Sequence, residues 1–126
     1  IEKDYLHTIR HRVEEAGLSN VEIIWGNVEK NGGTKIGAGA VDVVIASNIF
    51  FQVEDKSGFI EEAFRILKLH GRLFLSDWTE ESVMKKFAVP SSRTREMFER
   101  SGFVYEREMD TGDQHYGMIF RKAEKT

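Results

Sequence analysis

The sequence predicts an α/β fold whose sheet is mostly parallel and ends in an antiparallel hairpin. Strand-like and helix-like segments alternate over residues 21–101, and this alternation is typical of parallel strands joined by helical crossovers. The last two strand-like segments, 103–110 and 114–122, are separated only by Thr-Gly-Asp at 111–113, which indicates a tight turn between antiparallel strands.

The composition is that of a single globular domain. The chain has 126 residues, of which 40% are hydrophobic and 31% charged, and this balance argues against a disordered protein. Its net charge of −3 gives no overall positive field for nucleic acid. No apolar run approaches the roughly 20 residues of a membrane span, and the absence of cysteine excludes disulfides and thiolate metal sites within these residues. We therefore expect a cytoplasmic location and no membrane partner.

The N-terminal third predicts one helix, one strand and a long loop. Apolar residues at helical spacing predict a helix over Asp4–Ala16. The β-branched and aromatic run Val21–Trp25 predicts a strand. We expect Trp25 in the core. Residues 26–40 hold five of the eleven glycines and predict a loop in which Glu29 is solvated.

The middle of the chain predicts a strand–helix–strand unit. Val41–Ser47 is apolar apart from Asp42, which is the pattern of a strand buried on both faces. A wide apolar stripe over Ser57–Leu69 predicts a helix with Ser57 as its cap. The remaining elements before the hairpin are a strand at Arg72–Trp78, a short helical stretch at 80–87 and a helix at 93–101.

Polar and aromatic side chains gather where the two central strands end. Those after the first strand are Ser47, Asn48, Phe50, Phe51 and Gln52, and those at the end of the second are Ser76, Asp77 and Trp78. In open α/β sheets, ligands bind in the crevice outside the carboxyl ends of parallel strands. The sequence therefore predicts a binding site at this edge of the sheet.

Four segments carry a resemblance to a known family. They are AGLSNVEIIWGNVE at 16–29, VDVVIASNIFFQV at 41–53, EEAFRILKLHGRLFLSDW at 61–78 and TREMFERSGFVYE at 94–106. In this order and at these separations they resemble the C-terminal two-thirds of a class I S-adenosylmethionine-dependent methyltransferase. The resemblance implies a Rossmann-like methyltransferase sheet, S-adenosyl-L-methionine as cofactor, and methyl transfer to an unidentified acceptor.

The family's N-terminal cofactor elements have no counterpart in these residues. Gly32, Gly33, Gly37 and Gly39 lie between strands and do not form the strand–loop–helix fingerprint of a nucleotide-binding loop. The resemblance thus implies that residues 1–126 are a single partial domain whose sheet lacks its first two strands. We expect the chain to be part of a longer enzyme, with a strand edge and apolar faces exposed.

The resemblance assigns cofactor contacts to two short segments. One is Gly26, Asn27 and Val28, and the other is Ser47 and Asn48. Asn27 matches a position beside the adenine, where an amide can both donate and accept hydrogen bonds. An ordinary Gly-Asn turn is an equally good interpretation of Asn27. We expect Trp25 in the core rather than stacked on the adenine.

The same resemblance places the acceptor near five further residues, which are Phe50, Phe51, Gln52, Asp77 and Trp78. Packing between helix and strand is an equal alternative for the two phenylalanines. Asp77 would orient an acceptor amine or hydroxyl or act as a base, or it would cap the following helix. Methyl transfer depends mainly on aligning the nucleophile with the methyl carbon, and no catalytic base is assigned.

Other polar clusters fit a solvated surface better than a site. His7 and His11 share a helix face but lack a third ligand, so no metal site is predicted. His115 is expected to be exposed in the hairpin. The basic cluster of Lys85, Lys86, Arg93 and Arg95 is expected to be solvated.

Two other functions compete with methyl transfer. A non-catalytic α/β module would bind a nucleotide-like ligand or a partner, and Asn27 in place of an acid favours it for this chain. A nicotinamide-binding domain lacks support because there is no G-x-G-x-x-G sequence. A small molecule is the simplest acceptor. The sequence leaves a nucleic acid or protein acceptor and the oligomeric state open.

The expectation of a longer enzyme is tested by reading the coding DNA upstream of Ile1. We expect a strand, a glycine-rich loop and a second strand whose terminal acid directly precedes Ile1. A start codon directly before Ile1 would contradict this expectation and favour the non-catalytic interpretation.

Overall fold

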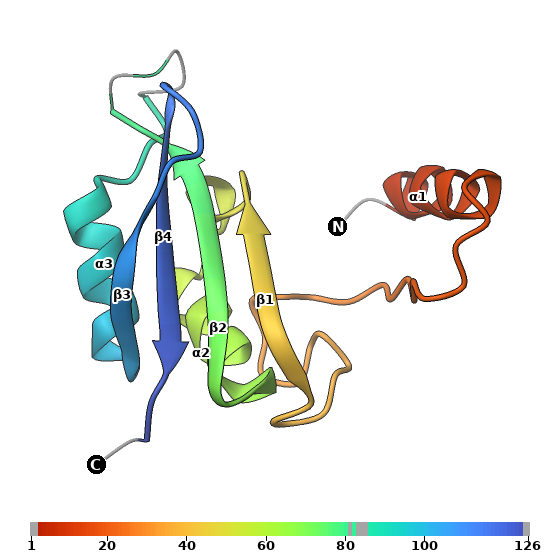
Figure 1. Cartoon of the computed structure of the whole chain (residues 1–126), viewed down its shortest axis with the longest axis horizontal. Helices are drawn as coiled ribbons and strands as arrows, with labels where there is room; N and C mark the ends of the chain where they lie inside the picture. Colours follow the sequence, from red (N-terminus) through yellow and green to blue (C-terminus); the bar gives the residue numbers. More distant parts are fainter. Residues whose placement is uncertain (1–2, 81, 83–85, 125–126) are drawn as a thin grey trace.

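The computed structural model describes residues 3–80, 82 and 86–124. Its elements are α1 (Lys3–Glu15), β1 (Val41–Ser47), the 3₁₀ helix η1 (Phe50–Gln52), α2 (Lys56–Ile66), β2 (Leu67–Trp78), α3 (Ser91–Arg100), β3 (Phe103–Met109) and β4 (His115–Lys122). The sheet has the order β1-β2-β4-β3. β1 and β2 are parallel, whereas β4 is antiparallel to both of its neighbours. Helices α2 and α3 lie on the same face of the sheet, and α1 is set apart from it (Figure 1).

Most of the predicted elements are confirmed, including the first helix, both parallel strands, the 93–101 helix and the hairpin. Helix α2 differs at both ends. Its N-cap is Asp55, whose Oδ1 accepts a hydrogen bond of 2.9 Å from the Gly58 N–H, so the prediction that Ser57 caps the helix is wrong. A carboxylate at this position also interacts favourably with the helix dipole. The helix ends at Ile66 because β2 begins at the next residue. The predicted helical stretch at 80–87 lies partly outside the described residues.

The predicted strand at Val21–Trp25 is wrong. This segment has no regular secondary structure, and the side chains of Val21, Ile24 and Trp25 are exposed. A strand is stabilised by backbone hydrogen bonds to a neighbour, and the four-stranded sheet ends at β1 without pairing with this segment. For the same reason Trp25, which is 46% exposed, is not the core residue that was predicted.

β1 is not buried on both faces as predicted. Ala46 is buried, but Val43 is 47% and Ile45 73% exposed. These two side chains alternate with the buried positions and so lie on the face opposite α2 and α3. The expected exposure of a strand edge and an apolar face is therefore confirmed at β1.

An aromatic cluster holds α3 and η1 against the sheet. The ring of Phe98, from α3, stacks on Phe120 of β4 with centroids 4.7 Å apart and lies 5.5 Å from Phe50 of η1. All three side chains are fully buried. Burial of each such side chain contributes about 1.5–3 kcal/mol, so this cluster fixes the segment that follows β1.

Across the described ranges, no helix combines the length and the apolarity that crossing a bilayer requires.

Replacing Phe98 with alanine tests the aromatic cluster. We expect Phe98→Ala to lower the free energy of unfolding by about 3–5 kcal/mol, because it leaves a cavity between the fully buried rings of Phe50 and Phe120. The matched control is Phe87→Ala at a side chain that is 55% exposed, which should change stability by less than about 0.5 kcal/mol. Urea unfolding measures both, and equal losses would contradict the assignment of Phe98 to the core.

Candidate functional site

The carboxyl ends of β1 and β2 lie side by side, as the sequence predicts. Ser47 is the register partner of Ser76, and the N–H of Asn48 donates a hydrogen bond of 2.9 Å to the Ser76 carbonyl. Asn48 has a φ of 56°, a left-handed backbone conformation that asparagine tolerates better than most residues. The sharp turn after β1 therefore places the Asn48 side chain at the sheet edge, beside the end of β2.

Asp77 fixes the segment after β1 to the end of β2. It is 1% exposed, and its two carboxylate oxygens accept hydrogen bonds from the Phe51 N–H (3.0 Å) and the Trp78 N–H (2.8 Å). Burial raises the pKa of this carboxyl, while hydrogen bonds from the backbone at Trp78, Phe51 and Phe50 oppose the shift. Asp77 therefore holds η1, which precedes it in the chain. The helix that it was predicted to cap, at 80–87, lies partly outside the described residues.

His115 belongs to the same edge, and the prediction that it is exposed is wrong. It is the register partner of Trp78, and the two rings pack at a tilt, with centroids 4.2 Å apart and an interplanar angle of 33°. Its Nε2 lies 2.7 Å from Oδ1 of Asn48. His115 is half-buried because β4 lies next to β2 in the sheet. The contacts of His115 depend on the order of the strands in the sheet, which local sequence patterns do not reveal.

The three residues of η1 differ in how far they are available to a ligand. Phe50 is fully buried in the aromatic cluster, which supports the packing interpretation for this side chain. Phe51 is half-buried and Gln52 is exposed. Of the residues predicted to border an acceptor, Phe51, Gln52 and Trp78 therefore have accessible side chains.

Apart from the sheet edge, a cavity of about 480 Å³ lies in the loop before β1. Its lining residues are Trp25, Gly26, Asn27, Val28, Glu29, Gly33 and Lys35. The Lys35 ammonium lies 5.4 Å from the centroid of the Trp25 ring. Asn27 Oδ1 accepts a hydrogen bond of 2.9 Å from the Glu29 N–H, and Asn27 N–H donates to the Gly33 carbonyl. Asn27 thus forms an Asx turn, and its amide nitrogen is left for a ligand.

The two predicted cofactor segments do not line a common cavity, although Val28 lies near the residues that flank Ser47 and Asn48. The Val28 side chain lines a narrow groove of about 130 Å³ together with Ala46 and Ile49, next to the end of β1. The larger cavity is lined by residues 25–29, 33 and 35, and neither Ser47 nor Asn48 lines it.

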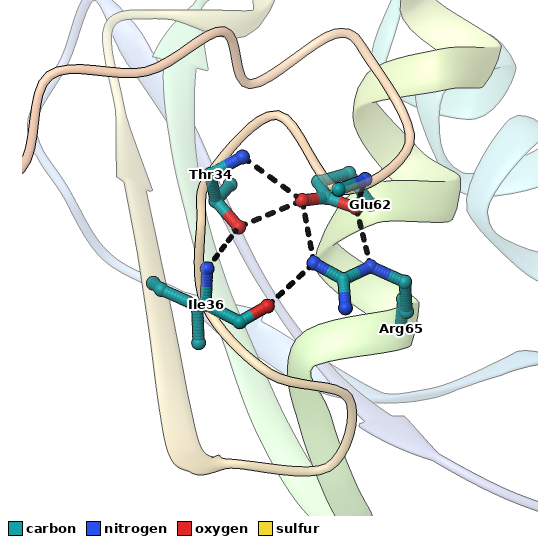
Figure 2. Close-up of polar contacts among 5 residues, drawn as sticks. Thr34, Ile36, Glu62 and Arg65 are labelled. Carbon is teal, nitrogen blue, oxygen red and sulfur yellow. Dashed lines mark hydrogen bonds and ion pairs between the residues drawn. The ribbon is translucent and has the colours of Figure 1, made fainter.

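A buried carboxylate that sequence reasoning missed docks this loop on α2 (Figure 2). Glu62 is 1% exposed and accepts hydrogen bonds from the backbone N–H groups of Gly32 (2.9 Å) and Thr34 (3.1 Å) and from the Thr34 hydroxyl (2.7 Å). Arg65 forms a bidentate pair with it at 2.7 and 2.8 Å and also donates to the Ile36 carbonyl. The signal in the sequence is that Glu62 falls on the apolar stripe, three residues after Phe59 and four before Ile66.

The electrostatics of this cluster favour the charged carboxylate. The Arg65 guanidinium, with Thr34 and the Gly32 N–H, holds the pKa of the Glu62 carboxyl well below its ordinary value, although burial acts in the opposite direction. Glu29 contributes a second tie, because its carboxylate accepts a hydrogen bond of 2.6 Å from the Asp55 N–H. The prediction that Glu29 is solvated is therefore wrong.

The comparisons with known proteins identify the family. The profile of the family described as methyltransferase domain matches residues 1–124. This chain belongs to that family. Human arsenite methyltransferase is 39% identical over 69 residues, which are 53% of this chain and 18% of that protein.

Solved structures agree with the fold of this methyltransferase domain. A SAM-dependent methyltransferase from Aquifex aeolicus superposes with a TM-score of 0.85 at 20% identity, covering 96% of this chain and 65% of that one. The trans-methyltransferase CalH, in complex with SAH, gives 0.80 at 19% identity, covering 98% of this chain and 41% of that one. The predicted class I methyltransferase sheet is thus confirmed, and the chain spans only part of the length of these relatives.

The histidine and lysine clusters of this methyltransferase domain are surface features. His11 pairs with Glu15 at 3.0 Å on the exposed helix α1, and no group of three potential metal-ligating side chains occurs within the described ranges. Lys86, Arg93 and Arg95 are exposed, and Arg95 stacks on the Tyr105 ring. The fourth member of the predicted basic cluster, Lys85, lies outside the described residues.

Replacing Glu62 with glutamine tests the buried cluster. Glu62→Gln keeps the shape of the side chain but removes the charge that Arg65 and three hydrogen-bond donors surround, so we expect a loss of at least about 2 kcal/mol in the free energy of unfolding. Glu61→Gln, at the exposed neighbouring position, is the matched control and should be near neutral.

The pH dependence of this difference has a defined sign. The pKa of Glu62 is lower in the folded state, so the contribution of its charge is fully present above the ordinary glutamate pKa of about 4.5 and is lost as the pH falls below it. The stability gap between wild type and Glu62→Gln, measured by urea unfolding, should therefore shrink in acid. A gap that stays constant down to pH 3 would contradict this account.

Proposed function

We propose that this domain takes part in methyl transfer from S-adenosyl-L-methionine to a small-molecule acceptor. The observation that carries the proposal is the cluster of Asn48, Asp77 and Trp78 at the carboxyl ends of β1 and β2, joined by His115 from the start of β4, in a methyltransferase-family sheet. Ligands of open α/β sheets bind at this edge. The proposal also rests on the family match over residues 1–124.

The residues present fit the cofactor. The 480 Å³ cavity has the size of a small-molecule site. Its exposed Trp25 ring offers a stacking surface, and the free amide nitrogen of Asn27 can donate to a ring nitrogen of adenine. In this proposal Gly26, Asn27 and Val28 hold the adenine end, and Ser47 and Asn48 lie along the methionine end.

S-adenosyl-L-methionine, when bound, supplies an electrophilic methyl group. The chain's own contribution is to orient the acceptor atom toward that group and to exclude water. Phe51, Gln52 and Trp78 are the side chains placed to border the acceptor, whereas both oxygens of Asp77 already accept backbone hydrogen bonds. Asp77 thus supports η1 and Trp78 in preference to acting as a base.

The acceptor is proposed to be a small organic molecule. The curated relative named above acts, by its name, on arsenite. These 126 residues contain no cysteine, and hence no thiolate, the ligand that soft ions prefer. The similarity to that relative covers 18% of its length, and the proposal does not include its arsenite substrate. The cytoplasmic location stays a prediction.

One observation favours the second candidate, a non-catalytic module that binds a nucleotide-like ligand or a partner. Oδ1 of Asn27 already accepts a hydrogen bond from the Glu29 N–H, so one of its two lone pairs remains for the exocyclic amine of adenine. Asn27 therefore has less acceptor capacity at this position than a free amide or a carboxylate has.

Isothermal titration with S-adenosylhomocysteine and with NAD separates these functions. We expect the chain to bind S-adenosylhomocysteine in preference to NAD, and Asn27→Ala to weaken that binding by about threefold to tenfold, as expected for one lost hydrogen bond. Asn20→Ala, at an exposed position outside the cavity, is the control and should bind like the wild type.

Two results would overturn the proposal for this chain. Equal or tighter binding of NAD would point to a different nucleotide, and failure to bind either ligand would favour the non-catalytic interpretation.

A further inference from the structure

The contact between His115 and Asn48 joins three strands at the edge of the sheet. Asn48 follows β1, Trp78 ends β2 and His115 begins β4. The imidazole is held by its tilted packing against the Trp78 ring, with centroids 4.2 Å apart, and by the register pairing of these two residues. The backbone of Asn48 is held by its N–H bond to the Ser76 carbonyl. Both partners of the contact are therefore fixed independently of each other.

The chemistry of the contact fixes which way the Asn48 amide faces. Its Oδ1 is only an acceptor, so Nε2 of His115, 2.7 Å away, must carry a proton and donate. This holds for the neutral ring as well as for imidazolium, because both can have a proton on Nε2. With Oδ1 engaged, the amide nitrogen of Asn48 and its two N–H groups are the end that is free for a ligand.

We propose that His115 is a positioning residue that orients Asn48 so that the sheet edge presents hydrogen-bond donors, and not an oxygen, to the bound ligand. The ligand group at this point is then an oxygen acceptor, such as a carboxylate or a hydroxyl. An ammonium group has only donors and finds no partner on the amide nitrogen. This inference rests on the proposed function, because it takes S-adenosylhomocysteine as the ligand whose carboxylate meets Asn48.

Two substitutions of His115, by residues that match each other in shape, are expected to change the affinity for S-adenosylhomocysteine differently. His115→Gln places an amide N–H donor where Nε2 lies, and it should bind S-adenosylhomocysteine within about threefold of the wild type. His115→Glu offers only acceptors there, so the Asn48 amide turns over and presents its oxygen, and affinity should fall at least about tenfold. His115→Leu, neutral and without a donor, separates loss of the hydrogen bond from added charge and should fall between the two.

A substitution of Asn48 itself gives a second test that leaves His115 intact. Asn48→Asp keeps the shape and still accepts from His115 but has no donor, so S-adenosylhomocysteine should again bind at least about tenfold more weakly. Asn20→Asp adds the same charge at an exposed position and is the control. Thermal unfolding shows whether each variant is folded. Equal affinities of His115→Gln and His115→Glu, or wild-type affinity of Asn48→Asp, would overturn the inference.

Nitrogen NMR of the histidine side chains tests the orientation without any ligand. We expect the neutral ring of His115 to carry its proton on Nε2, and His115 in Asn48→Ala to lose that fixed tautomer. A proton on Nδ1 in the wild type would overturn the inference, whatever the titrations show. If the wild type binds no S-adenosylhomocysteine although Nε2 is protonated, the proposed function fails for this chain while the orienting contact stands.

Discussion

The charge of Glu62 lies in the protein interior, where it has to be matched by neighbouring groups. Arg65 supplies the opposite charge, and donors from the loop at 32–34 satisfy the remaining lone pairs. The last carbonyl groups of α2 accept bonds from Gly39 and Ala40, immediately before β1. The loop is thus fixed to the helix at residues 32–34 and at residues 39 and 40. This attachment determines where the 480 Å³ cavity lies relative to the sheet edge.

Gly58 shows how closely the loop approaches the same helix. A Cβ atom at this position would come within 2.2 Å of the Glu29 carbonyl oxygen, so a larger residue would push the loop away. The Glu29 carboxylate bonds to Asp55, which also caps the helix. Contacts at Glu29, Gly58 and Glu62 therefore fix the position of the loop before β1, which has no regular secondary structure, against α2.

The sequence predicted the elements that local patterns determine and missed those that depend on a distant partner. Val41–Ser47 and Val21–Trp25 have similar apolar patterns, yet only the first has a neighbouring strand to pair with. The clustering of Asn48 and Asp77 could be predicted because the ends of neighbouring parallel strands share one edge. The role of His115 could not, because it requires knowing that the last strand lies next to β2. The burial of Glu62 is visible in the helical periodicity, but its partners in the loop, Gly32 and Thr34, are about 30 residues away.

The position of β4 in the sheet also affects when the sheet can be completed during synthesis of the chain. β4 is the last strand of the chain, but it lies between β2 and β3, so the sheet remains in two pieces until residues 115–122 have been synthesised. Chains emerge from the ribosome N-terminus first, at about 5–20 residues per second. The β1–α2–β2 unit can therefore fold early, while His115 reaches Asn48 only at the end of synthesis. It follows that a nascent chain lacks the contact between His115 and Asn48 until residues 115–122 have been synthesised.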